Sequence, residues 1–251
     1  PNGRRIFNVA IRTIQLNQGK AIYGVGGGIT WDSTWESEYR EVHQKAAVLY
    51  RKQARFQLIT TGKISKKNLL FEEQHIERLR KAGRYFAFSF DVEDLKQKIE
   101  EECQACDINQ DYRLRISLSK SGEIAVDCQA LEPLSPTFCQ AKLCLQEANL
   151  QQAFTYFKTT HRPHLNLGKH EKIYHNTRGE LLETSIGNLV LKIDGKLYTP
   201  PIRFGILPGI YRQHLLETGQ LEEKVLTFAD IDQAEAIYGC NAVRGLYELS
   251  L

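Results

Sequence analysis

A single lysine in an aromatic segment is the residue of this chain best suited to covalent chemistry. Lys158 follows the run Phe154–Phe157 and precedes Thr159–Arg162. An amine held against apolar side chains loses hydration, which lowers its pKa and makes the neutral form available for Schiff-base formation. The alternative is a lysine at the end of a strand that extends its amine to water. The surrounding sequence has to decide between the two.

The first half of the chain predicts the elements that would support this chemistry. A hairpin is expected over residues 4–30, with Asn17–Lys20 as its turn, and a helix from about Ser37 to Tyr50. An α+β module follows, because short alternating segments flank two segments of helical periodicity. Its expected elements are strands at 56–61 and 66–70 around a turn at Gly62-Lys63, helices at 71–86 and 92–103, and a hairpin at 112–128.

The second half carries Lys158 and a second group of strands. Glu132–Pro136 contains two prolines in a polar stretch, which predicts a linker. The aromatic run before Lys158 is interpreted as a strand. Beyond it the expected elements are strands at 142–145, 174–177, 183–193, 196–199 and 237–242, a helix that opens at 207–212 with Pro208 in its first turn, and a helix at 227–236.

The composition excludes several classes of function. The 251 residues include 33 basic and 30 acidic side chains, which leave a formal charge of +3. This balance is too even for a surface that binds nucleic acid or a membrane, but it allows an anionic small molecule. No apolar run approaches the ~20 residues of a membrane-spanning helix. No secretory signal is recognised, so we expect a cytoplasmic protein, and the lone Cys103–Cys106 C-x-x-C predicts no functional metal.

The N-terminal segment resembles a known family. Asn8–Thr13, Gly26–Ser33 and Glu38–Lys45 are similar to the last segment of the chorismate-utilising enzymes, specifically component I of aminodeoxychorismate synthase. The resemblance implies that the arginine and the glycine backbone receive a substrate carboxylate, and that Glu38 and Glu41 match magnesium-site positions. These two glutamates lie at i and i+3 on one helix face. We interpret residues 1–48 as a remnant of that synthase domain, inactive alone.

The rest of the chain resembles the fold-type IV pyridoxal-phosphate enzymes, that is, the class IV aminotransferases. Four separated segments carry the resemblance, in the family's order: Phe71–Leu79, Lys158–Arg162, Glu183–Leu189 and Gly205–Arg212. The resemblance implies an α/β (α+β) fold of two domains similar to D-amino-acid and branched-chain aminotransferases, with the cofactor in the cleft. We expect a small domain at 49–133 and a larger domain at 134–251 that carries the lysine.

Residue roles follow from this resemblance. Lys158 would bind pyridoxal 5'-phosphate covalently and then move protons, and Glu183 would face the pyridine nitrogen and keep it protonated. Arg78 would pair with the cofactor phosphate. The remaining expected contacts are the backbone amides of Ile210 and Tyr211 at a helix start, and the turn at Asn241 and Ala242. His75 belongs to the Arg78 motif but is interpreted as a structural helix residue.

The combination of the two resemblances favours one reaction. A synthase-like segment joined to a fold-type IV module is typical of proteins that make p-aminobenzoate, so we expect a lyase that converts 4-amino-4-deoxychorismate to p-aminobenzoate and pyruvate. The substrate has two carboxylates, and Arg244 is the candidate to bind one of them. A homodimer and a glutaminase partner for the synthase are further implications. A branched-chain or D-amino-acid aminotransferase and a non-catalytic scaffold stay open as alternatives.

Overall fold

The computed structural model describes residues 13–50, 54–146 and 153–251, and the chain forms two compact units, residues 1–54 and 55–251. Each unit is considered by itself. The first part of the expected hairpin, residues 4–12, and the Asn8–Arg12 part of the synthase-like motif lie outside the described residues. In the part of the chain that the structure describes, no helix is both long and apolar enough to cross a membrane.

The first unit consists of a short hairpin and one helix. Strand β1 (Ile14–Asn17) pairs antiparallel with β2 (Lys20–Tyr23), and helix α1 spans Trp35–Tyr50. Gln18 and Gly19 both adopt positive φ at the hairpin turn, which matches the right-handed twist of the two strands. The strands are shorter than the predicted hairpin, because residues 24–30 do not pair.

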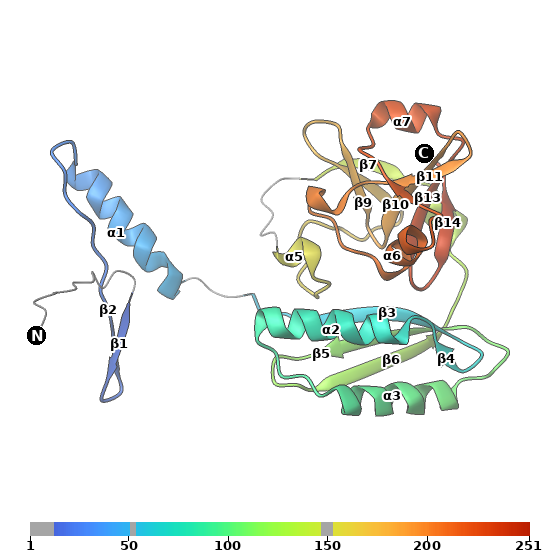
Figure 1. Ribbon diagram of the computed structural model, residues 1–251, viewed down its shortest axis with the longest axis horizontal. Coiled ribbons are helices and arrows are strands. Elements are labelled where there is room, and N and C mark those ends of the chain that lie inside the picture. The colour runs from blue at the N-terminus through green and yellow to red at the C-terminus, as the bar shows by residue number, and fades with distance from the viewer. Residues whose placement is uncertain (1–12, 51–53, 147–152) are drawn as a thin grey trace, which may run out of the picture. The chain divides into compact units, whose positions relative to one another are not determined.

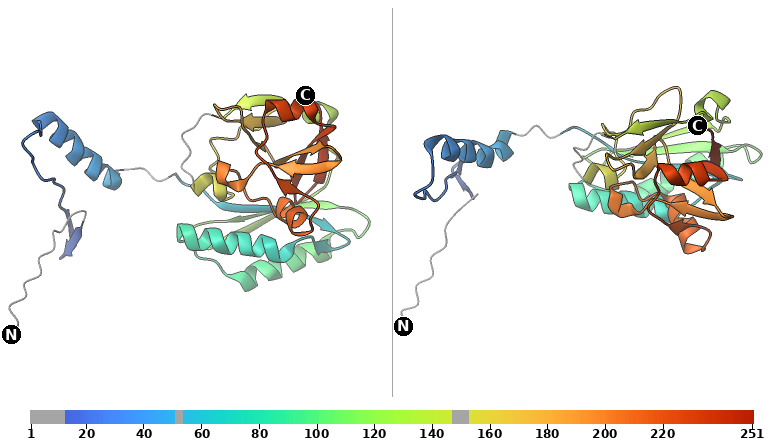
Figure 2. Two further views of the ribbon diagram at one scale, coloured as in Figure 1. Left: turned by 45° about the horizontal axis from the view of Figure 1, so that its top comes forward. Right: turned by 90° about the horizontal axis from the view of Figure 1, so that it is seen from above.

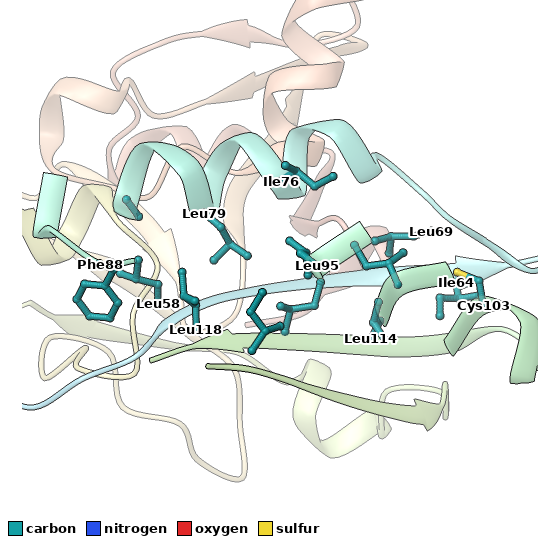
Figure 3. Close-up of a cluster of buried hydrophobic side chains, with 14 of the residues drawn as sticks. Leu58, Ile64, Leu69, Ile76, Leu79, Phe88, Leu95, Cys103, Leu114 and Leu118 are labelled. Carbon is teal, nitrogen blue, oxygen red and sulfur yellow. The ribbon is translucent and has the colours of Figure 1, made fainter. Parts of the chain in front are cut away.

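The second unit begins with an antiparallel sheet in the order β4-β3-β5-β6, against which helices α2 and α3 pack (Figure 1). The bounds are β3 Leu58–Ser65, β4 Asn68–Leu69, α2 Glu72–Phe86, α3 Val92–Ala105, β5 Tyr112–Leu118 and β6 Ile124–Ala130. Side chains alternate between the two faces of a strand. Leu58 and Ile64 of β3, and Leu114 of β5, point toward the helices into an apolar core (Figure 3).

The turn of this sheet does not lie where the sequence predicted it. Gly62-Lys63 is part of the continuous strand β3, and the chain reverses at Lys66 and Lys67, which both have positive φ. Gly62 serves a different purpose: a Cβ there would lie 2.6 Å from Nε2 of His75 and 2.7 Å from Leu69. The glycine therefore marks a close approach of helix α2 to the strand.

The remainder of the second unit contains a larger mixed sheet (Figures 1 and 2). Within the described residues its eight strands run in the order β12-β11-β10-β9-β8-β7, with β13 paired to both β10 and β14. The strands are β7 Lys142–Leu145, β8 Lys172–His175, β9 Leu181–Thr184, β10 Asn188–Ile193, β11 Lys196–Thr199, β12 Glu222–Glu223, β13 Ala236–Asn241 and β14 Gly245–Leu249. The helical segments are α4 Pro136–Cys139, α5 Ala153–Tyr156, η1 Ile202–Phe204, α6 Ile210–Glu217 and α7 Phe228–Gln233.

Three predictions in this half were wrong in detail. Most of the aromatic run before Lys158 forms helix α5 instead of a strand, and the ring centroids of Phe154 and of Phe157, which follows the helix, lie 5.5 and 5.3 Å from that of Phe86. The predicted strand at 183–193 is divided into β9 and β10 by a tight turn, in which Thr184 N–H donates to Gly187 O at 2.9 Å. Pro208 precedes the N-cap of α6 and is not in its first turn.

The segment that carries Lys158 connects the two sheets. Ile59 N–H donates to the carbonyl of Lys158 at 3.0 Å, and Thr160 N–H donates to Gln57 O at 2.9 Å. The Thr160 hydroxyl accepts from Gln57 N–H at 2.9 Å in return. The backbone at Lys158 is therefore hydrogen-bonded to the β3 region of the β4-β3-β5-β6 sheet, although the residue lies in the part of the chain that forms the larger sheet.

The Gly62→Ala variant should destabilise the protein by about 1–3 kcal/mol, because the added methyl group would overpack the contact with His75 and Leu69. Urea unfolding followed by circular dichroism measures the change. Gly168→Ala is the matched control: its Cβ would meet nothing closer than 3.9 Å, so its effect should stay within about 0.5 kcal/mol. Equal losses in the two variants would refute the packing role of Gly62.

Candidate active site

A cavity of about 470 Å³ lies in the second unit and is lined by residues from both sheets. It brings together every predicted site residue of this unit except Tyr211, whose neighbour Ile210 is present. Tyr211 instead lies beside Phe71 and Gly245. The lining residues used below are Thr61, Arg78, Arg113, Arg115, Lys158, Arg162, Glu183, Asn188, Gly209, Ile210, Asn241, Ala242 and Arg244.

The amine of Lys158 faces this cavity in an environment that disfavours its charge. Burial among protein atoms lowers its pKa well below the usual value, and the nearby cations Arg78, Arg162 and Arg115 lower it further. Glu183 opposes the effect but is the weakest contribution. The site therefore favours the neutral, nucleophilic form of the amine more than water does.

Glu183 lines the cavity and carries one carboxylate oxygen without a partner among the described residues. The residue is only 2% exposed, and its Oε2 accepts from Leu207 N–H at 3.3 Å. Its Oε1 is buried and has no hydrogen-bond partner among the described residues. Burial raises the pKa of Glu183 to about 7, against the opposing influence of Arg162, the Leu207 N–H and Lys158. A buried acceptor without a donor requires an explanation, and a protonated ring nitrogen in the cavity would supply the missing donor.

A second buried carboxylate, that of Glu171, holds the turn between β9 and β10 through hydrogen bonds. Glu171 is completely buried, and its Oε1 accepts from the backbone N–H groups of Ser185 at 2.9 Å and Lys172 at 3.1 Å. The Tyr247 hydroxyl donates to its Oε2 at 3.0 Å. Because Ser185 begins the turn that follows Glu183, these bonds hold the Glu183 strand end in place.

The part of the cavity wall at Arg78 and the start of α6 is suited to an anion such as a phosphate group. The guanidinium of Arg78 donates to the carbonyl of Pro208 at 2.8 Å, next to the start of α6. Gly209 is the N-cap there, and a Cβ on it would meet Oδ1 of Asn188 at 2.0 Å, so only glycine fits. Asn188 in turn donates to the carbonyl of Leu207 at 2.8 Å. The free N–H groups of the α6 start therefore lie beside a cation.

The second predicted phosphate contact is a compact turn. Oδ1 of Asn241 accepts from the backbone N–H groups of Val243 and Arg244, both at 2.9 Å. Its Nδ2 donates to the carbonyl of Ile186 at 3.3 Å. Asn241 thus shapes the turn with its side chain, and Ala242 lines the cavity beside it.

His75 contacts strand β3 and does not line the cavity. Its Nδ1 is 2.6 Å from the Thr60 hydroxyl, and it is not among the lining residues. Burial, and then Arg78 and Lys158, lower its pKa well below the usual value, so the ring is neutral. This geometry fits the structural role expected from the sequence.

The structure adds cationic residues that the sequence analysis did not select. Arg113 and Arg115 line the cavity from β5 and, with Arg244, supply three guanidinium groups. Arg113 is paired with Asp127 at 3.2 Å. The signal in the sequence was the alternation of these arginines with Leu114, but alternation alone does not say which face of the strand lines a cavity. Asn188 and Arg162 were part of the matched motifs but had no assigned role.

The glutamates predicted at magnesium-site positions lie in the first unit. Glu38 accepts from the Ser33 hydroxyl at 2.7 Å, and Glu41 pairs with Lys45, whose amine also donates to the carbonyl of Gly26 at 2.8 Å. No group of three side chains that could hold a metal ion occurs among the described residues. The magnesium assignment stays a prediction.

Comparison with known proteins gives two family matches and several similar chains. Residues 1–51 match the chorismate binding enzyme family. A curated protein of Schizosaccharomyces pombe, "Putative aminodeoxychorismate lyase", is 23% identical over 161 residues, which cover 59% of this chain and 68% of that protein. The match to the amino-transferase class IV family is longer and is described below.

Two solved structures share the fold of the second unit. A "Putative amino-acid aminotransferase" from Mesorhizobium loti is 27% identical with a TM-score of 0.68, and covers 78% of this chain and 99% of its own. A "Putative 4-amino-4-deoxychorismate lyase" from Legionella pneumophila is 20% identical with a TM-score of 0.61, and covers 77% and 81%. These similarities confirm the predicted fold-type IV architecture. Because the family model matches residues 57–250, the chain belongs to the amino-transferase class IV family, the pyridoxal-phosphate-dependent enzymes.

Proposed function

We propose that residues 55–251 form a lyase that converts 4-amino-4-deoxychorismate to p-aminobenzoate and pyruvate with pyridoxal 5'-phosphate. The observation that carries the proposal is that Lys158, whose pKa burial lowers, and Glu183, whose Oε1 has no hydrogen-bond partner among the described residues, line one cavity in a chain that also matches the chorismate binding enzyme family. A synthase of that second family would supply the substrate of the lyase. The similarity to the Schizosaccharomyces pombe protein supports the same reaction.

The residues that would hold the cofactor follow from the geometry of the cavity. Glu183 would accept the ring N–H with its free Oε1. At the other end, the phosphate would be held by Arg78, by the backbone amides of Ile210 and Tyr211, and by the turn at Asn241 and Ala242. When bound, the cofactor supplies an electron sink that makes loss of a proton from the substrate carbon feasible.

Lys158 would carry the cofactor and then act as the base. Its neutral amine can take the proton from the ring carbon that bears the amino group, and can later return a proton. Loss of the enolpyruvyl group then gives an aromatic ring. Because aromatisation provides much of the driving force, the main tasks of the protein are orientation and proton transfer.

The arginines at the cavity would orient the substrate. Aminodeoxychorismate has two carboxylates, and Arg244, Arg113 and Arg115 line the same cavity as Lys158. Within the described part of the chain Arg115 and Arg244 form no salt bridge, whereas Arg113 pairs with Asp127. Guanidinium groups suit planar, bidentate binding of carboxylates. We assign substrate binding to Arg244 and add Arg115 as its counterpart on β5.

A class IV aminotransferase of branched-chain or D-amino acids is the second candidate, because the Mesorhizobium loti aminotransferase has the higher identity among the structures compared. It would use the same Lys158 and Glu183 but return the amino group to a keto acid. A non-catalytic scaffold is the third, and the presence of both residues in one cavity argues against it.

The proposal extends to the assembly of the protein. Residues 1–51 would be the end of a synthase module in a bifunctional p-aminobenzoate synthase, with Glu38 and Glu41 at its magnesium site. A glutaminase subunit would bind that synthase module, and the lyase module would form a cytoplasmic homodimer.

Purified protein given pyridoxal phosphate and aminodeoxychorismate should release p-aminobenzoate and pyruvate in equal amounts, measured by chromatography and a coupled lactate dehydrogenase assay. Lys158→Ala should lower kcat by at least about 10²–10⁴-fold, since it removes the proton-transferring amine. Steady amino-group exchange with keto acids and no aromatic product would favour the aminotransferase. Lack of any Lys158-dependent absorbance of bound cofactor would favour the scaffold.

Titration of Glu183 should lower the free energy of unfolding of the apoprotein as the pH rises. Its pKa is about 7 in the folded chain against an ordinary 4.5, so the folded state holds the proton more tightly and stability falls between these two pH values. Glu183→Gln lacks this titration. Relative to the parent protein, the variant should gain about 3 kcal/mol between pH 4 and pH 8 in urea unfolding without cofactor. Glu248→Gln, at an exposed position on β14, is the control, and a pH-independent difference for Glu183→Gln would contradict the assignment.

A further inference from the structure

Arg162 is the charged residue that lies against Glu183. Its Nη2 is 3.6 Å from Oε2 of Glu183, and the two side chains are 15% and 2% exposed. The Leu207 N–H binds the same Oε2 at 3.3 Å. Both protein partners therefore use one oxygen, and Oε1 of this cavity-lining residue is left without a hydrogen-bond partner among the described residues.

The backbone around Arg162 is fixed by a tight local network. The Thr159 hydroxyl accepts from His161 N–H at 3.2 Å and donates to the carbonyl of His161 at 2.9 Å. Leu165 N–H donates to the carbonyl of Arg162 at 3.1 Å. Because this network begins one residue after Lys158, the same short segment positions both the amine and the guanidinium.

The guanidinium has little else to neutralise it. Its Nε and Nη2 have no hydrogen-bond partner within the described residues. Its nearest charged neighbours besides Glu183 are cationic, since Arg78 and Lys158 both lie within electrostatic range. Tyr174 is a minor favourable neighbour. Glu183 and Arg162 thus depend on each other: removing one partner of a buried pair leaves an uncompensated charge.

We propose that Arg162 is a positioning residue that acts through Glu183: it keeps the buried carboxylate ionised and directs Oε1 to the ring nitrogen of the cofactor. The inference rests on the proposed pyridoxal-phosphate chemistry. Without the guanidinium, burial would favour the protonated, neutral carboxyl, which cannot hold a proton on the ring. The groups that face Glu183 are Arg162 and Lys158 from one segment and the Leu207 N–H from the loop before α6.

Binding of pyridoxal phosphate to the apoprotein, measured by fluorescence across pH 5–9 without substrate, tests this role. In the parent protein the affinity should fall on the acid side as Glu183 is protonated, near its pKa of about 7. Arg162→Met should move this fall upward by about 1–3 pH units, the usual effect of one close opposite charge. Arg162→Lys retains the charge and should restore most of the profile, and it serves as the test variant if Arg162→Met does not fold.

A double-variant cycle with Glu183→Gln separates this role from direct substrate binding. If Arg162 acts through Glu183, then Arg162→Met should change neither the pH profile nor kcat further in the Glu183→Gln background. Arg178→Met is the matched control, because it breaks the Arg178–Glu180 pair at a side chain that is 73% exposed, and it should leave the profile unchanged.

Two results would overturn the inference. The first is an unshifted pH profile of cofactor binding in Arg162→Met or, if that variant does not fold, an Arg162→Lys profile shifted by as much as is expected for loss of the charge. The second is an increase in KM for aminodeoxychorismate that is equal in the parent and Glu183→Gln backgrounds. The second result would make Arg162 a substrate-binding residue. Failure of the parent protein to bind pyridoxal phosphate at all would instead refute the proposed function, so the two failures are distinguishable.

Discussion

The chemistry that the cavity can support depends on the interactions of one buried carboxylate, Glu183. Glu183 is the next-to-last residue of β9 and has almost no access to water, and an ionised group there is costly unless its oxygens are bound. Leu207 N–H donates to one oxygen, Arg162 forms an ion pair with the same oxygen, and Glu171 fixes the following turn through Ser185. The other oxygen remains for a ligand. The unpartnered oxygen thus destabilises the folded protein until a hydrogen-bond donor enters the cavity.

The two sheets contribute different parts of the site. The larger sheet supplies Glu183 and the turn at Asn241 and Ala242, whereas β3 and β5 supply another part of the wall, with two arginines on β5. Alternation makes this division possible: Leu114 points to the helices while Arg113 and Arg115, its neighbours in sequence, point to the cavity. One strand pair therefore serves as both core and binding surface.

The sequence predicted the central residues because their chemistry is local and their motifs are specific. Lys158, Arg78 and Glu183 come from distant segments, yet each lies in a segment whose pattern pointed to its role, and the structure brings them to one cavity. The errors arose where tertiary contacts overrule local pattern. Gly62 resembled a turn because the approach of His75 cannot be read from the strand itself, and the aromatic run became a helix because it packs on Phe86. The partner of Arg162 was equally unreadable, since ion pairs across sheets follow from topology.

The backbone pairing of Lys158 with β3 has a consequence for folding kinetics. The hydrogen bond between Gln57 and Thr160 spans 103 positions of the chain. Contacts of such high sequence separation form only after the entropy of closing a long loop has been lost, and they slow folding. The reactive amine is therefore aligned late, when both sheets are already in place. In partly folded chains the lysine would be neither buried nor surrounded by cations, and its amine would be an ordinary, protonated one of low reactivity toward cellular aldehydes.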